Sequence, residues 1–134
     1  MNEMKTAEKA NEMHVCGYNC AQCVLSSLGE YTGLDEKTAL AISAGFGGGL
    51  RSGEVCGAIS GGVMALGLAF PFTDADDAEA KQRIAALAKT LVAAAREKYG
   101  AVRCEELKAK GISCSELIGT LSEMTEETIK SDRR

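Results

Sequence analysis

Six cysteines are the residues of this chain that are best suited to chemistry. Four of them share a local setting, because each lies at or near an expected helix start: Cys20, Cys56, Cys104 and Cys114. The unpaired N–H groups and partial positive charge of a helix N-terminus stabilise a thiolate and lower the thiol pKa. The pattern therefore indicates redox or metal–thiolate chemistry rather than four inert buried cysteines.

Two of these helix starts have the spacing of a capping box, with cysteine at the first helical position. The pairs that would form the boxes are Asn19 with Gln22 around Cys20, and Ser113 with Glu116 around Cys114. Both thiols are therefore expected in the first turn of a helix.

Cys56 is the expected attacking thiol. Arg51 lies shortly before it in the chain, and a nearby cation favours a thiolate. The glycine-rich turn from Gly45 to Gly49 could admit a substrate, and an anion-binding nest near Arg51 stays open. The turn lacks the GxGxxG order and the lysine of a nucleotide-binding loop. In dithiol exchange, this thiolate would attack a disulfide and a second cysteine would resolve the product.

Cys16, Cys20 and Cys23 together spell CxxxCxxC. The spacing is similar to the cluster motif of radical SAM enzymes, but those enzymes need a much larger barrel of alternating strands and helices. The CxxC within it would indicate a thioredoxin-like dithiol only in a βαβ context, which the sequence does not show. A labile iron–sulfur cluster at this triplet stays open. The lone histidine, His14, is expected at the surface, although it lies only two residues from Cys16.

The segment from Val55 to Phe72 is expected to position these thiols, since it runs 18 residues without a charge. It is shorter than the roughly 20 apolar residues of a membrane span. It also contains four glycines and ends near a proline. We therefore expect a buried helix over about residues 53–70, at the centre of a compact, all-α bundle of five or six helices.

Other helices are expected over residues 2–15, 20–31, 36–44, 76–99 and 104–110, and from 113 to about 121 or beyond. In the longest of them, apolar residues form one stripe and a capping box is expected at Thr73 and Asp76. The stripe consists of Ile84, Leu87, Leu91, Ala95 and Tyr99. The chain is expected to be one domain over residues 1–134, with an N-terminal helix within 1–16 and a charged tail, 125–134, that frays.

Composition excludes several function classes. A net charge of −4 argues against nucleic-acid binding, and the acidic N-terminus does not read as a secretory signal. A cytoplasmic location is therefore expected, where six cysteines are more often redox-active or metal-binding than a disulfide scaffold.

Several motifs resemble the C_GCAxxG_C_C family, small bacterial and archaeal proteins described as redox-active. The motifs are GYNCAQ at 17–22, GFGGG at 45–49, CGAISG at 56–61, CEEL at 104–107 and CSEL at 114–117. The resemblance runs from about Gly17 to Leu117. The family pattern maps by position onto Cys20, Cys56, Cys104 and Cys114, and it leaves out Cys16 and Cys23.

Three functions stay open at this point. The leading one is a cytoplasmic redox protein that uses these four cysteines, with Arg51, in thiol–disulfide exchange or electron transfer. The alternative is a module whose four cysteines bind an iron–sulfur cluster or zinc. The third is a structural helical bundle with inert cysteines. The sequence names neither a redox partner nor a reaction, and a homodimer is compatible with so small a domain.

Overall fold

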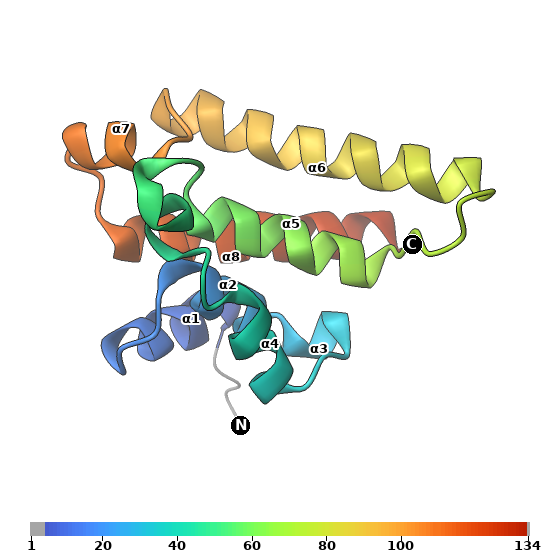
Figure 1. Cartoon of the computed structure of the whole chain (residues 1–134), viewed down its shortest axis with the longest axis horizontal. Helices are drawn as coiled ribbons and strands as arrows, with labels where there is room; N and C mark the ends of the chain where they lie inside the picture. The colour runs from blue at the N-terminus through green and yellow to red at the C-terminus, as the bar shows by residue number, and fades with distance from the viewer. Residues whose placement is uncertain (1–4, 134) are drawn as a thin grey trace.

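The computed structural model describes residues 5–133, and this part of the chain is all-α, as the sequence predicts (Figure 1). The elements are α1 (Thr6–Val15), α2 (Cys20–Ser27), α3 (Gly29–Thr32), α4 (Glu36–Ser43), the turn η1 (Gly49–Gly53), α5 (Gly57–Ala69), α6 (Ala78–Tyr99), α7 (Cys104–Ala109) and α8 (Cys114–Asp132). Across residues 5–133, no helix combines the length and the apolar character needed to cross a membrane.

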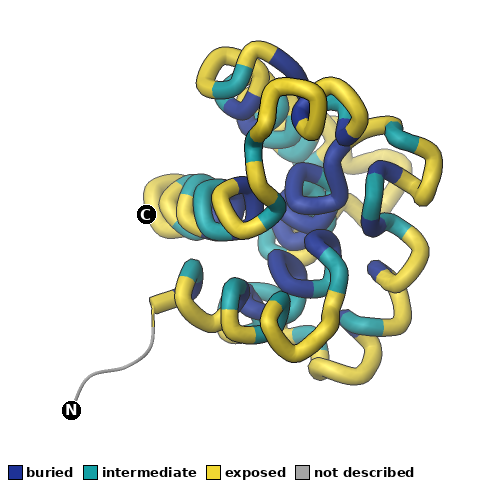
Figure 2. Tube along the Cα trace, turned by 90° about the vertical axis from the view of Figure 1, so that its left-hand side faces the viewer, coloured by how far each residue is buried: buried dark blue, intermediate teal, exposed yellow. Residues whose placement is uncertain are grey.

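Helix α5 is the buried centre of the bundle, as expected. It packs against α2, α3, α6 and α8, and its surroundings form the dark core of Figure 2. Two glycines bring the neighbouring helices close: a Cβ at Gly61 would lie 2.8 Å from the Ala21 carbonyl oxygen, and one at Gly62 would lie 2.6 Å from Thr125 Oγ1. The helix begins at Gly57 rather than near residue 53, because η1 occupies the preceding residues.

The expected helix over residues 20–31 is two helices, α2 and α3, which meet at Leu28. Leu28 is fully buried and its φ and ψ angles are −97° and 16°, outside the helical range. Ser26, Ser27 and Gly29 around it are weak helix formers, so the chain can bend here at little cost. This division and the turn η1 give the described part of the chain more helical elements than the five or six expected.

Helix α6 buries Leu91 and Ala95 from the predicted stripe, and Ile84, Leu87 and Tyr99 are half-buried against the core. The predicted position of the α6 N-cap was wrong by a few residues. Asp77, rather than Thr73 or Asp76, caps the helix by accepting a 3.0 Å hydrogen bond from the Ala80 N–H.

The expectation of a frayed tail was also wrong, because α8 continues to Asp132. Thr125 and Ile129 are fully buried on this part of the helix. Glu126 is tied to other helices, since its carboxylate accepts hydrogen bonds from the hydroxyl groups of Thr6 at 2.6 Å and Tyr31 at 2.7 Å. The charged residues from Glu126 to Asp132 therefore lie on the outer and interhelical faces of an ordered helix.

Candidate functional site

The four cysteines expected at helix starts line one cavity of about 220 Å³. They come from α2, the N-cap of α5, the start of α7 and the start of α8, and Figure 1 shows η1, α7 and the start of α8 at the same end of the bundle. Arg51 also lines this cavity, so the structure brings together the four cysteines at helix starts and the cation that the sequence analysis assigned to them. The complete lining is His14, Asn19, Cys20, Gly48, Arg51, Cys56, Cys104, Leu107, Lys108, Ile112, Cys114 and Leu117.

The start of α2 has the expected capping box. The Asn19 side chain accepts from the Gln22 N–H, and the Gln22 side chain accepts from the Asn19 N–H, each at 3.0 Å. The same two side chains donate to carbonyl oxygens of the α4 region, at Ala44 (3.0 Å) and Leu40 (3.1 Å). The box therefore caps the helix of Cys20 and also fixes its start against the chain that leads into the glycine-rich turn.

The start of α8 has only half of the expected box. The Ser113 hydroxyl accepts a 3.1 Å hydrogen bond from the Glu116 N–H. The Glu116 carboxylate does not return to Ser113 but accepts from the Tyr99 hydroxyl at 2.9 Å. This contact joins the start of α8 to the end of α6, so the helix of Cys114 is also held by its neighbour.

An isolated antiparallel bridge between Val55 and Arg103 holds two of the cysteines in register. The Cys56 N–H donates to the Val102 carbonyl at 2.8 Å, and the Cys104 N–H donates to the Glu54 carbonyl at 2.6 Å. Arg103 forms ion pairs with Glu54 (3.5 Å) and Glu105 (3.0 Å). These pairs are half-exposed, so each adds only about 0–1 kcal/mol, and the backbone bonds do most of the positioning.

The turn before α5 is left-handed over four successive residues. Gly48, Gly49, Leu50 and Arg51 have φ angles of 65°, 64°, 60° and 57°. This conformation costs a residue with a side chain about 1–2 kcal/mol, so Leu50 and Arg51 are strained. The turn places the Gly48 N–H against the Cys20 sulfur and the Arg51 side chain at the cavity. Strain of this kind is typical of functional sites.

The environment of Cys20 lowers its thiol pKa from 9.0 to about 6. The largest cause is the hydrogen bond from the Cys56 thiol, and the N–H groups of Gly48, Ala21 and Ala58 add to it against the opposing effect of burial. The pKa of Cys56 is raised, first because its thiol donates this hydrogen bond and then because it is buried. The pair therefore carries its negative charge on Cys20 and its proton on Cys56, although the sequence led us to expect the thiolate at Cys56.

The other cysteines differ from this pair. Burial raises the pKa of Cys114. Burial and the charge of Cys20 raise the pKa of Cys23 to about 12, and its thiol donates a 3.6 Å hydrogen bond to the Tyr18 carbonyl oxygen. Cys23 does not line the cavity, and Cys16 is exposed outside it.

The metal-binding alternative has no preformed ligand group in the described residues. Among residues 5–133, no three His, Cys, Asp or Glu side chains lie close enough together to hold a metal ion. This applies to the four cysteines of the cavity and to the CxxxCxxC triplet. All six cysteines are free thiols in the structure.

Two basic residues of the cavity were missed by the sequence analysis. His14 is half-buried and lines the cavity, although we expected a surface position. Lys108 also lines it, on the helix that begins at Cys104. The sequence did contain a signal for Lys108, because it lies four residues after Cys104 and residues four apart on a helix share a face.

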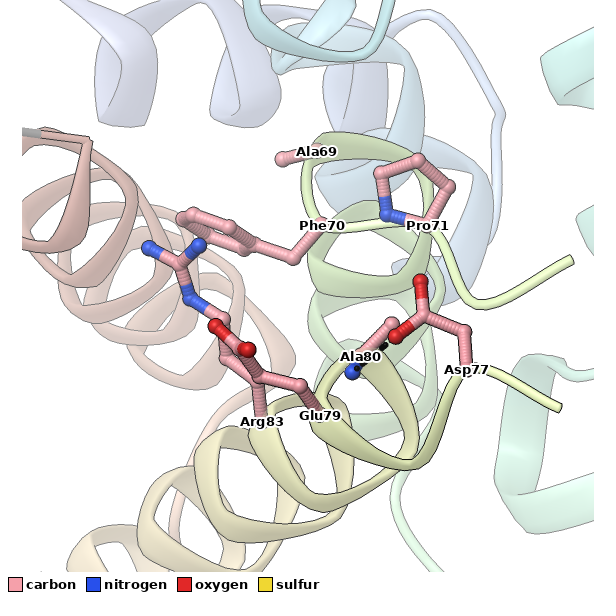
Figure 3. A pocket seen from close by; sticks show the side chains of 7 residues that line it. All are labelled: Ala69, Phe70, Pro71, Asp77, Glu79, Ala80 and Arg83. Atoms are coloured by element: carbon pink, nitrogen blue, oxygen red, sulfur yellow. Dashed lines mark hydrogen bonds between the residues drawn. The ribbon is translucent and has the colours of Figure 1, made fainter. Parts of the chain in front are cut away.

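A second hollow lies at the other end of α5 and has a different character (Figure 3). The Arg83 guanidinium lies over the Phe70 ring, 4.5 Å from its centroid, on the side of the Glu79 carboxylate, whereas Asp77 lies on the side of Pro71. Its lining contains no cysteine or histidine, and Asp77 is occupied as the cap of α6. These contacts join α5 to α6, so this hollow is accounted for by packing.

Comparison with known proteins gave one match. The model of a family described as "Putative redox-active protein (C_GCAxxG_C_C)" matches residues 18–128. No curated protein and no solved structure matched the chain. The matched range contains Cys20, Cys56, Cys104 and Cys114.

Proposed function

Because the chain belongs to the C_GCAxxG_C_C family, we propose that it carries out thiol–disulfide exchange through a dithiol formed by Cys20 and Cys56. The observation that carries the proposal is that Cys20 and Cys56 line the same cavity, where hydrogen bonding from the Cys56 thiol lowers the pKa of Cys20. A thiolate is the attacking species in disulfide exchange, and a second thiol within contact of it can resolve the product.

In the first step, the Cys20 thiolate attacks one sulfur of a substrate disulfide. An S–S bond forms between Cys20 and that sulfur, and the other substrate sulfur leaves as a thiolate. This leaving group takes the proton of Cys56. The Cys56 thiolate then attacks the Cys20 sulfur, so that a Cys20–Cys56 disulfide forms and the second substrate thiolate leaves. The substrate disulfide gains two electrons and the dithiol loses two.

This assignment differs from the expectation that Cys56 attacks first. Three backbone N–H groups and the Cys56 thiol act on the Cys20 sulfur, whereas two backbone N–H groups act on the Cys56 sulfur and Cys56 donates its own proton to Cys20. Cys56 suits the resolving role, because the loss of the Cys20 charge in the mixed disulfide removes causes of its raised pKa and makes its thiol more acidic.

Cys104 and Cys114 are proposed as a second dithiol. They line the same cavity, and the charges of Cys20 and Cys104 both act on the pKa of Cys114. Exchange within the chain would transfer the disulfide from Cys20–Cys56 to Cys104–Cys114. This restores two thiols at the first pair while two are consumed at the second, so no external reductant is needed for that transfer.

The test follows the disulfides directly. Reduced protein is mixed with hydroxyethyl disulfide, quenched with acid, alkylated with N-ethylmaleimide and mapped by peptide mass spectrometry. We expect a mixed disulfide at Cys20 to accumulate in Cys56→Ser. In Cys20→Ser, we expect the other cysteines of the cavity to be oxidised more slowly than in the unaltered protein. Cys16→Ser, which changes an exposed cysteine outside the cavity, is the matched control and should behave as the unaltered protein. Oxidation of Cys20→Ser at the unaltered rate would contradict the proposal.

A further inference from the structure

We infer that the cavity of the four cysteines selects small disulfides that carry carboxylate groups. This inference rests on the proposed function and adds its substrate class. It comes from the charges that line the cavity, from their lack of partners, and from the size of the cavity.

The lining of the cavity is basic in a protein that is acidic overall. The chain has 19 acidic and 15 basic residues, apart from its histidine. The twelve residues of the cavity include His14, Arg51 and Lys108 but no aspartate or glutamate. A cleft lined by one sign of charge concentrates ligands of the opposite sign.

The two cations at this cavity are not neutralised by ion pairs in the part of the chain that the structure describes. In the described part of the chain, neither Arg51 nor Lys108 forms an ion pair, whereas Arg103 nearby forms two. Arg51 and Lys108 are both exposed, so a ligand can reach them. Two cations without partners beside a reactive thiol are available to bind carboxylates of an incoming molecule.

Arg51 and Lys108 reach the cavity from different segments. Arg51 belongs to η1, whose preceding residue Gly48 faces the Cys20 sulfur with its N–H. Lys108 belongs to α7, and its charge acts on Cys114. The reacting sulfur therefore lies in a cavity to which two separate segments bring cations, an arrangement that suits a disulfide with one carboxylate on each arm.

The cavity is also small. Its volume of about 220 Å³ lies below the roughly 300–1,000 Å³ of typical sites for drug-sized ligands. A disulfide with short arms suits this volume better than a folded protein domain does. The substrate class is therefore a low-molecular-weight disulfide with two acidic groups.

The experiment compares three small disulfides with arms of similar length: dithiodiglycolate, hydroxyethyl disulfide and cystamine, which carry two negative charges, none and two positive charges. The rate of mixed-disulfide formation at Cys20 is measured by mass spectrometry for each, in the full chain at low salt. Each rate is divided by that of free 3-mercaptopropane-1,2-diol with the same disulfide. This uncharged thiol is not the reduced form of any of the three disulfides, so its exchange can be followed and the division removes their intrinsic reactivity. We expect the normalised rate of dithiodiglycolate to exceed that of hydroxyethyl disulfide by about tenfold, with cystamine slowest.

Variants test whether Arg51 and Lys108 are the cause. Arg51→Asn removes the charge and suits the left-handed backbone of this position, and Lys108→Gln removes the second charge. The double variant should bring the ratio of dithiodiglycolate to hydroxyethyl disulfide close to one, and added salt should reduce it in the unaltered protein. Lys89→Gln, an equal charge change on the exposed face of α6, should leave the ratio unchanged. The ratio does not depend on the acidity of Cys20, because that acidity affects both substrates alike.

The outcomes distinguish failure of the inferred substrate class from failure of the proposed thiol–disulfide function. If all three disulfides modify Cys20 without a charge preference, or if the double variant keeps the preference, the substrate class is wrong and the thiol–disulfide function stands. If none of the three modifies Cys20, the proposed function fails and the substrate class fails with it.

Discussion

Gly57 lies directly against Cys20. A Cβ atom at Gly57 would lie 2.6 Å from the Cys20 sulfur and 2.7 Å from the Phe46 carbonyl oxygen. Gly57 does not have a positive φ angle, so the site requires the absence of a side chain rather than an unusual backbone. The start of α5 can therefore approach α2 closely enough for the Cys20 and Cys56 thiols to share a hydrogen bond.

Gly57→Ala should disturb both the packing and the thiol pair. Because the new methyl group would meet backbone atoms as well as sulfur, we expect a loss of about 1–3 kcal/mol in the free energy of unfolding, measured by urea denaturation. Gly67→Ala is the matched control, since a Cβ at Gly67 in the same helix meets nothing within 4 Å. It should be neutral or stabilising by up to about 1 kcal/mol. Equal effects of the two substitutions would show that the contact with Cys20 is unimportant.

The acidity of Cys20 should depend on the proton of Cys56. Cys56→Ala removes the donor, and a hydrogen bond to a charged group contributes about 1.5–3 kcal/mol, which corresponds to a rise of roughly 1–2 units in the Cys20 pKa. Cys56→Ser retains a donor and should raise this pKa less. The measurement is the pH dependence of iodoacetamide alkylation at Cys20, followed by mass spectrometry. A pKa that is the same in Cys56→Ala as in the unaltered protein would contradict the proposed pairing.

The alkylation rate of Cys20 in the native protein should rise with pH through a midpoint near 6 and then level off. The sign follows from the reactive species, since iodoacetamide reacts with the thiolate and protonation below the midpoint removes it. In denaturant the midpoint should return towards 9.0, because the thiol of Cys56 and the N–H groups no longer face the sulfur. The titratable and charged groups around the same cavity are His14, Arg51, Cys56, Cys104, Lys108 and Cys114. A native midpoint near 9.0 would contradict this prediction.

The left-handed turn predicts opposite effects of one substitution at two leucines. Leu50 has a φ angle of 60° and is 50% exposed, so Leu50→Gly should relieve strain and raise the free energy of unfolding by up to about 1 kcal/mol. Leu68 is 39% exposed on the right-handed helix α5, where Leu68→Gly should cost about 1 kcal/mol. Thermal unfolding of both variants gives the comparison. A loss at Leu50 as large as at Leu68 would show that the turn is not strained.

The last two turns of α8 should contribute to stability. Ile129 is fully buried there, so Ile129→Ala should lower the free energy of unfolding by about 2–5 kcal/mol. Lys130→Ala, at the next and exposed position, should change it by no more than about 0.5 kcal/mol. Urea denaturation of the two variants decides between an ordered and a frayed tail, because a frayed tail would make both substitutions neutral.

Local signals in the sequence were sufficient for most of the helix starts. The capping side chain of Asn19 and the position of Cys20 behind it depend on neighbours within one turn, and both were predicted. The tail was predicted to fray because that prediction considered only its high content of charged residues and not their spacing. Leu121, Thr125 and Ile129 recur four residues apart, which is the spacing of a buried helix face, and all three are fully buried.

Local signals in the sequence could not decide whether Cys20 or Cys56 is the thiolate. This choice depends on the Gly48 N–H, which acts on the Cys20 sulfur and not on that of Cys56, and which comes from a segment distant from Cys20 in the chain. Sequence reasoning assigned Arg51 to Cys56 by proximity along the chain, whereas the tertiary structure directs the turn before Arg51 at Cys20. His14 was missed for a related reason, because the bend between α1 and α2 brings it to the cavity.

The capping box, the left-handed turn and the β-bridge come from separate parts of the chain, and Cys20 has its acidic environment only when all of them are in place. An unfolded chain therefore carries six ordinary thiols, which react slowly with oxidants at neutral pH. Reactivity appears together with the native fold and is lost with it. The rate at which Cys20 is alkylated is then a direct chemical readout of folding, one that needs no fluorescent label and no tryptophan, a residue this chain does not contain.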